Sequence, residues 1–523
     1  MFGFSDSMKG KAMILLGLDI GTSGVKALLI DEKGATLASH TNEYPMDVPQ
    51  PGWAEQDPAL WWKATISSIR AVLSSSGVKG EDIAGIGLSG QMHSSVFLDA
   101  DDEVIRPSLL WCDGRTTAQR EWITQTAGGE EGMRRLVSNP PLEGFTAPKV
   151  IWLRDEEPAN FEKLSTLLLP KDYIRFLLTG EKLMEASDAA GTALFDVVKR
   201  EWSTELVDKL GIPRDILVPV RESVDEGGRI TAQVAALTGL KAGTPVACGG
   251  ADNTCGAIGT GIVKEGRVLS SLGTSGVVFA HTDDVRVDPE MRAHTFCHSV
   301  PGKWYLMGVV LSAGGSLRWM RDVVADSERA VAGESGRDPY DVMSDLASEA
   351  SVGSRGLMFQ PYLTGERTPH KDASARGSFV GLSLVHERKH LMRAVFEGIT
   401  FAMRDCMSII REQGIEITQI RATGGGAKNP FWRQMQADVY GAPVVTVSSG
   451  EGPAFGAALM GGVVAGVFGD LAEASDNLVK IVDTCEPDAG RASEYNEWYE
   501  RFRALYPALK NEYAALSEMT GAE

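Results

Sequence analysis

Residues 245–261 read PVACGGADNTCGAIGTG, and the rest of the chain is arranged around this stretch. A short apolar run ends in two glycines, and the acid Asp252 and the amide Asn253 follow directly. Glycine at this density permits backbone dihedrals that other residues cannot adopt and lets a ligand approach the main chain. An acid on such a loop is suited to chemistry, although Asp is also a common helix cap. On local sequence alone both interpretations stand.

The length and composition predict a large globular protein of two domains. The chain has 523 residues, more than one hydrophobic core normally serves. Hydrophobic residues make up 43% and charged residues 23%, as in ordinary globular proteins. A formal net charge of −19 argues against a nucleic-acid-binding surface, but it leaves room for a local phosphate pocket. The histidines and cysteines form no CxxC or HExxH motif, so no metal cage is visible and a reducing, cytoplasmic location is favoured.

No membrane segment or signal peptide is expected. Residues 1–12 are short and polar, and they predict a disordered lead-in. The longest uncharged apolar run, at 453–468, is shorter than the ~20 residues that cross a bilayer. Because this run is rich in glycine and alanine, it predicts a closely packed internal helix.

Two parts of the chain repeat one pattern. Residues 13–31, MILLGLDIGTSGVKALLID, predict a strand, a glycine-containing turn and a second strand, and residues 266–280, GRVLSSLGTSGVVFA, predict the same. The pentapeptide GTSGV occurs at 21–25 and again at 273–277. Chance recurrence of a turn sequence is the alternative to an internal repeat. The repeat predicts two similar α/β domains that face each other, each presenting a Gly/Ser/Thr hairpin to the cleft between them.

Other glycine motifs indicate which kind of nucleotide site the chain can form. Gly85, Gly87 and Gly90 form a GxGxxG pattern, but the following residues alternate like a strand, so a dinucleotide fingerprint is not expected. No GxxxxGK[ST] is present, which excludes a P-loop. The triplet at 424–426 lies between a predicted strand and a predicted helix, a geometry that presents backbone N–H groups to an anion or a ribose.

These elements together meet the needs of phosphoryl transfer, which requires donors around the phosphates, acids that hold Mg²⁺ and a base for the accepting hydroxyl. The two GTSG turns and Gly314 can supply donors. Asp19, beside the first turn, could order a hydrated Mg²⁺. Asp252 could accept the hydroxyl proton as a general base.

A series of motifs along residues 13–510 resembles those of the FGGY family of carbohydrate kinases and, within it, those of the xylulokinases. The motifs are GLDIGTSGVK (17–26), PGWAEQDP (51–58), GQMH (90–93), WCDGR (111–115), GFTAPK (144–149), LPKDY (169–173), SDAAGT (187–192), GGADN (249–253), SLGTSGV (271–277), PYLTGERTPH (361–370) and GGGAKN (424–429). They stand in the family's order, and as a set they are highly specific.

The resemblance implies two domains of the actin-like, ribonuclease-H-like fold. A sugar-binding N-terminal domain would cover 13–262 and an ATP-binding C-terminal domain 263–515. It also implies an ATP- and Mg²⁺-dependent kinase that converts D-xylulose to D-xylulose 5-phosphate and works without nucleic acid or membrane. A homodimer is the default expectation.

The resemblance further implies roles for individual residues. Asp252 would be the catalytic base, and Asp19 would act in catalysis and hold Mg²⁺ through water. Sugar would be bound by Met92, His93, Asp252 and Asn253. The positions that match nucleotide contacts are Thr22, Ser23, Gly273, Thr274, Ser275, Gly314, Gly425 and Asn429.

Some questions stay open at this stage. Ser94 stands where xylulokinases commonly have glycine, which leaves the preferred ketose open. Trp53 and Trp111 are core residues or contacts to sugar or lid, and Arg115 either pairs with Asp113 on a surface turn or lines the sugar cleft. The alternative functions are a related kinase for another ketose, a polyol or glycerol, and a non-enzymatic actin-like ATPase switch.

Overall fold

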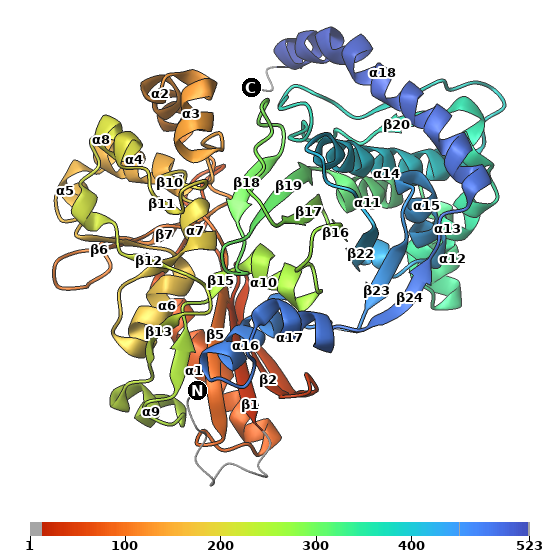
Figure 1. Ribbon diagram of the computed structural model, residues 1–523. Helices are drawn as coiled ribbons and strands as arrows, with labels where there is room; N and C mark the ends of the chain where they lie inside the picture. Colours follow the sequence, from red (N-terminus) through yellow and green to blue (C-terminus); the bar gives the residue numbers. More distant parts are fainter. Residues whose placement is uncertain (1–12, 449, 521–523) are drawn as a thin grey trace.

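The computed structural model describes residues 13–448 and 450–520. It contains two α/β units, one at the left and one at the right of Figure 1, each built on a seven-stranded sheet. The lead-in expected at 1–12 lies outside the described residues. The two-domain α/β architecture predicted from the repeat is confirmed.

The first sheet has the strand order β13-β14-β5-β1-β2-β3, with β15 also paired to β5. β1 and β2 form an antiparallel hairpin around the first GTSG turn, and β1 runs parallel to β5 on its other side. The strands are β1 Ile14–Ile20, β2 Gly24–Asp31, β3 Thr36–Glu43, β5 Ile83–Gly90, β13 Glu226–Arg229, β14 Pro245–Ala247 and β15 Gly250–Ala251.

The second sheet has the order β18-β19-β17-β16-β22-β23-β24. Its hairpin β16–β17 is flanked by antiparallel β19 and parallel β22, as β1–β2 is flanked by antiparallel β3 and parallel β5. The internal repeat is therefore one of topology as well as of sequence. The strands are β16 Arg267–Leu272, β17 Gly276–Thr282, β18 His294–Cys297, β19 Trp304–Val310, β22 Gln419–Gly424, β23 Val444–Val447 and β24 Ile481–Cys485.

Helices cover these sheets and begin and end at the residues the sequence marks. In the first long helix, α1, the Asp57 side chain accepts a hydrogen bond from the Ala59 N–H, Pro58 opens the first turn and Gly77 ends the helix at φ +71°. The bounds of the main helices are α1 Pro58–Ser76, α2 Thr117–Ala127, α3 Gly129–Val137, α10 Asp252–Gly259, α11 Ala313–Val323, α12 Asp326–Ser335, α14 Arg388–Glu412, α15 Pro430–Tyr440, α16 Gly452–Val464 and α18 Ala489–Thr520.

Helix α16 is the apolar segment predicted near 453–468, and it packs on the first sheet although it comes late in the chain (Figure 1). A Cβ on Gly17, Gly85 or Gly87 would collide with the backbone of α16. The glycines that formally resemble a dinucleotide fingerprint thus let a helix lie directly on β5. In the part of the chain that the structure describes, no helix has the length and apolar character of a membrane span.

Candidate active site

The first glycine hairpin positions an acid at the end of β1. The Gly21 N–H donates to the Gly24 carbonyl at 3.0 Å and closes the turn. Asp19 lies two residues before Gly21 and is partly buried. Its Oδ1 accepts a 2.8 Å hydrogen bond from the Ser89 hydroxyl. Burial raises the pKa of Asp19, while the Ser89 bond and the charge of Lys26 lower it.

Asp252 is the first residue of α10, directly after the short strand β15. Its Oδ1 accepts a hydrogen bond from the Asn253 N–H at 2.7 Å. Burial and the nearby charge of Asp19 raise the pKa of Asp252 to about 7. A carboxyl group that is half ionised near neutral pH is suited to accept a proton from a hydroxyl.

The two acids lie close enough for the charge of Asp19 to raise the pKa of Asp252. In the described part of the chain, no group of three or more His, Cys, Asp or Glu side chains is arranged to hold a metal ion. Two neighbouring carboxylates without a third ligand fit Mg²⁺, which is held in proteins by one or two carboxylates together with substrate phosphates and water. The pair of acids is thus compatible with the predicted metal.

In the GQMH segment, His93 has a fixed orientation. Its backbone adopts φ +68°, its ring stacks on Phe145 at 4.2 Å, and its Nδ1 lies 2.6 Å from the Gly191 carbonyl oxygen. Because a carbonyl only accepts, Nδ1 carries the hydrogen and Nε2 remains an acceptor. Burial lowers the pKa of His93 to about 3, so the ring is neutral. Met92 is buried beside it, and its methyl group also faces Gly191.

Asn253 follows Asp252 and is tied to the second domain. Its Nδ2 donates to the Tyr305 hydroxyl at 2.8 Å. Its Oδ1 is buried and accepts no hydrogen bond from any described residue. A buried amide oxygen without a donor is unfavourable unless a ligand supplies one.

The second glycine hairpin is held by the start of α11. The Gly273 carbonyl accepts from the Gly314 N–H at 2.9 Å, and the Thr274 carbonyl accepts from the Gly315 N–H at 2.9 Å. A Cβ on Gly314 would collide with the Gly273 carbonyl oxygen, so this approach requires glycine. Gly273 and Thr274 are exposed and Ser275 is partly exposed, which leaves this turn open to a ligand.

The third predicted nucleotide element lies between β22 and α15. Gly424 has φ +76°, and residues 425–427 form a short 3₁₀ turn. The Asn429 side chain caps α15 by accepting from the Trp432 N–H at 3.1 Å and donates to the Ser344 hydroxyl at 2.8 Å. Gly425 thus presents open backbone, whereas the side chain of Asn429 already has structural partners.

Comparisons with known proteins decide the family. The N-terminal domain of the FGGY family of carbohydrate kinases matches residues 14–259, and its C-terminal domain matches residues 268–465. The chain belongs to the FGGY family of carbohydrate kinases. It is therefore an ATP-dependent carbohydrate kinase with the actin-like fold, as the motifs implied.

Relatives of this FGGY kinase align over nearly their whole length. A xylulose kinase of Bacillus subtilis (strain 168) is 39% identical over 502 residues, which cover 96% of this chain and 98% of the relative. A crystal structure described as a xyloylose kinase from Brucella ovis superposes with a TM-score of 0.89 at 39% identity and covers 95% of this chain and 99% of that one. A gluconate kinase from Lactobacillus acidophilus superposes with a TM-score of 0.90 at 28% identity, covering 97% and 100%.

In this FGGY kinase, Arg115 pairs with Asp113, as one of the two interpretations held, but the pair is buried and does not lie on the surface. Arg115 Nε bonds to Asp113 Oδ1 at 2.9 Å, and the Arg115 and Asp113 side chains are 1% and 0% exposed. The guanidinium lies 3.6 Å from the Trp53 ring centroid and pairs with Glu55 at 2.7 Å. Trp53 thus packs on an internal charge, while Trp111 is 48% exposed.

A buried charge cluster, not assigned from the sequence, supports the start of α10. Lys171 Nζ lies 2.7 Å from Asp172 Oδ1 and 3.3 Å from Asp188 Oδ2, and all three side chains are fully buried. From this cluster a chain runs through Glu185, which accepts from the Ser187 hydroxyl at 2.9 Å, and that hydroxyl accepts from the Ala251 N–H at 3.0 Å. The residue before Asp252 is therefore fixed. The signal was available in LLLPKDY, where charged residues stand inside an apolar run.

The loop around GERTPH contributes two further polar groups that the sequence analysis did not assign. Glu366 Oε1 accepts from the Leu311 N–H at 2.9 Å, and its buried Oε2 has no partner among the described residues. Burial raises the pKa of Glu366 to about 8. The Arg367 guanidinium makes no hydrogen bond or ion pair with a described residue, and its charge acts on His93 and His294. These groups line a cavity of about 670 Å³ between helices α2 and α3 and the second domain.

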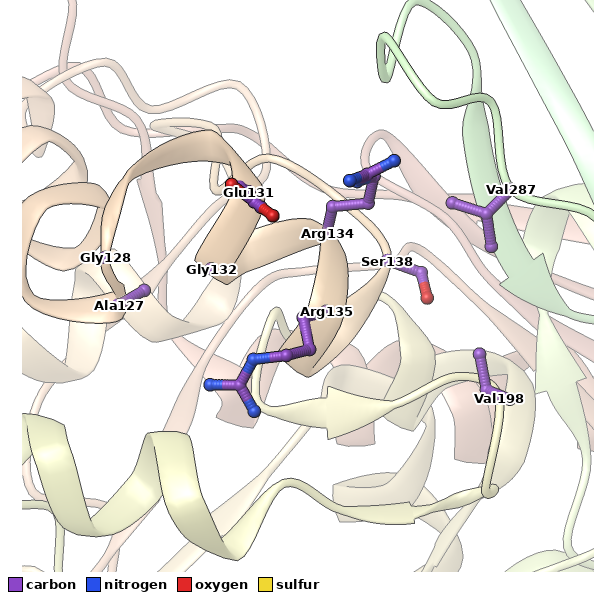
Figure 2. A pocket seen from close by; sticks show the side chains of 9 residues that line it. All are labelled: Ala127, Gly128, Glu131, Gly132, Arg134, Arg135, Ser138, Val198 and Val287. Atoms are coloured by element: carbon purple, nitrogen blue, oxygen red, sulfur yellow. The ribbon is translucent and has the colours of Figure 1, made fainter.

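A separate cavity of about 690 Å³ lies over α3 (Figure 2). Arg134 and Arg135 extend from α3 in different directions, and Val198 and Val287 lie across from them (Figure 2). Arg135 pairs with Glu205 at 2.6 Å. None of the described residues that line this cavity was assigned to sugar or ATP, so it is not the predicted site.

Proposed function

We propose that this FGGY kinase transfers the γ-phosphoryl group of ATP to D-xylulose and forms D-xylulose 5-phosphate. The observation that carries the proposal is the buried Asp252 carboxyl at the start of α10, whose pKa is raised to about 7. In the GQMH segment, His93 in addition offers a neutral acceptor nitrogen. Full-length similarity to xylulose kinases supports the substrate.

The sugar-binding proposal uses groups with free hydrogen-bonding capacity. His93 Nε2 can accept from one sugar hydroxyl, because Nδ1–H is committed to Gly191. Asn253 Oδ1 can accept from another, which would satisfy its buried oxygen. Met92 supplies apolar surface beside them. Alternating acceptors and apolar surface match a polyhydroxylated chain.

In the proposed reaction, the Asp252 carboxylate accepts the proton of the terminal hydroxyl. The hydroxyl oxygen then forms a bond to the γ-phosphorus while the bond from that phosphorus to the ADP oxygen breaks. The raised pKa makes Asp252 a stronger base than an ordinary carboxylate, and it is still largely ionised just above neutral pH. Asp19 would hold Mg²⁺ through water, and the ion would neutralise phosphate charge.

We assign ATP binding mainly to the second domain. The exposed turn of Gly273, Thr274 and Ser275 and the helix start at Gly314 would receive phosphates through backbone N–H groups. Gly425 would approach the nucleoside, and Asn429 would contribute by holding α15 rather than by a free amide. Ser23 and the backbone N–H of Thr22 would face the transferred phosphate from the other domain, because the Thr22 hydroxyl is already bonded to Trp111 and Gln91.

The deciding experiment measures ADP release with D-xylulose, D-ribulose, L-ribulose, L-xylulose, glycerol and gluconate for the native enzyme and Asp252→Asn. D-Xylulose should give the highest kcat/KM, and the variant should lose at least about 10³-fold because no base remains. For the native enzyme, kcat/KM should rise with pH up to about 7 and then level off, since only the ionised carboxyl accepts a proton.

Other outcomes have distinct meanings. Preference for another ketose or for gluconate, with the same loss in the variant, would move the substrate and keep the base. The similarity to a gluconate kinase structure at 28% identity is the reason to include gluconate in the panel. Activity that survives Asp252→Asn would refute the base. The homodimer stays a prediction, which size-exclusion chromatography with light scattering can test.

A further inference from the structure

Ser94, the residue that departs from the family pattern, has a buried hydroxyl with two partners. The hydroxyl accepts from the Trp111 backbone N–H at 3.0 Å and donates to Gln91 Oε1 at 3.1 Å. Ser94 is 0% exposed and Gln91 is 1% exposed, so water does not compete for these bonds.

Trp111 and Gln91 are also connected through Thr22. The Trp111 indole N–H donates to Thr22 Oγ1 at 2.9 Å, and Thr22 Oγ1 lies 3.3 Å from Gln91 Oε1, to which it donates. The four bonds form a closed ring through Ser94, Gln91, Thr22 and Trp111, which we call the Ser94 ring. Since an indole N–H and a backbone N–H only donate, both hydroxyls must give their proton to Gln91 Oε1, which has two lone pairs.

The position of the ring connects two parts of the proposed site. Thr22 belongs to the first glycine hairpin, and Ser94 directly follows Met92 and His93. Gln91 is anchored because its backbone N–H donates to the Ile20 carbonyl at 2.9 Å. Trp111, held through both its backbone and its indole nitrogen, is the exposed member, at 48%.

The ring also shows what a residue without a hydroxyl would lose. Removal of the Ser94 hydroxyl would leave the Trp111 N–H without its acceptor and Gln91 Oε1 with one donor fewer. Buried groups left in this state are costly, and the segment that carries them shifts to find new partners. Trp111 would be the part that moves, because it is the most exposed member of the ring, at 48%.

We propose that Ser94 is a positioning residue for the sugar: its hydroxyl closes a ring that fixes the Trp111 indole as a wall of the ketose subsite. The inference rests on the proposed function in that it takes the Met92–His93 side as the sugar side. It adds a residue that acts through Trp111 and touches no reacting atom.

The test compares Ser94→Ala with Ser95→Ala, using steady-state kinetics with varied D-xylulose and varied ATP. Ser95 is an apt control because it is the next residue, is also 0% exposed, and its Oγ has no hydrogen-bond partner among the described residues. Ser94→Ala should raise the KM for D-xylulose about tenfold, with kcat and the KM for ATP within about twofold of native. Ser95→Ala should leave all three within about twofold.

Two further variants separate positioning from general damage. Ser94→Cys preserves volume and makes only weak hydrogen bonds, so its sugar KM should fall between those of the native enzyme and Ser94→Ala. If Ser94→Ala fails to fold by thermal melting, this variant carries the test. Trp111→Phe removes the indole donor but keeps an aromatic face. Its effect and that of Ser94→Ala should combine to less than their product, because each alone opens the ring.

Equal KM values for D-xylulose in Ser94→Ala and Ser95→Ala would overturn the inference. So would an equal increase in the KM for D-xylulose and the KM for ATP in Ser94→Ala. A double variant, Ser94→Ala with Trp111→Phe, whose KM increase equals the product of the two single increases would also overturn it. These failures are distinct from failure of the proposed function, which would appear as absent D-xylulose turnover in the native enzyme.

Discussion

The two GTSGV hairpins have the same five residues, but different groups form hydrogen bonds with their turns. In the first, the Thr22 hydroxyl lies between Trp111 and Gln91, the Thr22 carbonyl accepts from Gln56 Nε2 at 2.7 Å, and the Tyr44 hydroxyl donates to the Gly21 carbonyl at 2.5 Å. In the second, α11 supplies only backbone N–H groups. Side chains therefore bond to the first turn, whereas, among the described residues, only backbone groups bond to the second.

The residue two places before each turn also differs. The first hairpin has Asp19 there and the second has Ser271. Asp19 lies beside Ser89 and acts electrostatically on Asp252. In the proposed division of roles, the same turn sequence serves chemistry in one domain and nucleotide binding in the other, because the residues around it differ.

The largest expected effect comes from the residue that distinguishes the hairpins. Asp19→Asn should lower kcat by roughly 10²–10³-fold and raise the Mg²⁺ concentration needed for half-maximal rate, because a carboxylate that orders the ion is lost. Ser271→Ala, at the matching position of the other hairpin, should stay within about threefold. Mg²⁺ titrations of ADP release measure both, and similar losses in the two variants would contradict the assigned division of roles.

An intermediate effect should follow from disturbing the open hairpin. Gly314→Ala places a Cβ against the Gly273 carbonyl and should lower kcat/KM for ATP roughly 10–100-fold, with a smaller effect on the KM for sugar. The matched control is Gly333→Ala in α12, where an added Cβ meets nothing within 4 Å. Nucleotide binding by isothermal titration calorimetry gives an independent measure. Unchanged ATP affinity in Gly314→Ala would remove this turn from the nucleotide site.

The smallest expected effect compares the two threonines directly. Thr22→Val removes a hydroxyl that is bonded within the first domain, so it should raise the KM for sugar about threefold to tenfold. Thr274→Val removes an exposed hydroxyl and should instead raise the KM for ATP by a similar factor. Steady-state kinetics with each substrate varied in turn measures this. If both variants raised the KM for the same substrate, the two hairpins would differ in burial and not in the substrate that they bind.

Local patterns in the sequence predicted much of this structure. The hairpins at 13–31 and 266–280 and the internal helix near 453–468 were visible because turn glycines and runs of apolar residues act over short range. The family follows from motifs that stand in order along the chain. Asp19 and Asp252 could each be proposed because Asp19 stands at the end of a predicted strand beside a glycine turn, and Asp252 follows a short apolar run in a glycine-rich loop.

What the sequence could not predict depends on contacts between distant residues. The Ser94 ring joins positions 22, 91, 94 and 111, and nothing local in any of them indicates the others. The sequence left open whether Arg115 pairs with Asp113 on a surface turn or lines the sugar cleft, because its contacts with Trp53 and Glu55 come from a distant segment. Asn429 matched a nucleotide position by motif, while its neighbours made it a helix cap.

The close approach of α16 to the glycines of β1 and β5 has a consequence for synthesis of the protein. β1 and β5 are among the first segments to leave the ribosome, and α16 emerges only after every strand of the second sheet except β24. Until then the face formed by Gly17, Gly85 and Gly87 lacks its covering helix. The N-terminal domain therefore cannot complete its core during its own translation, and a nascent chain stalled before residue 452 carries an apolar face for chaperones to bind.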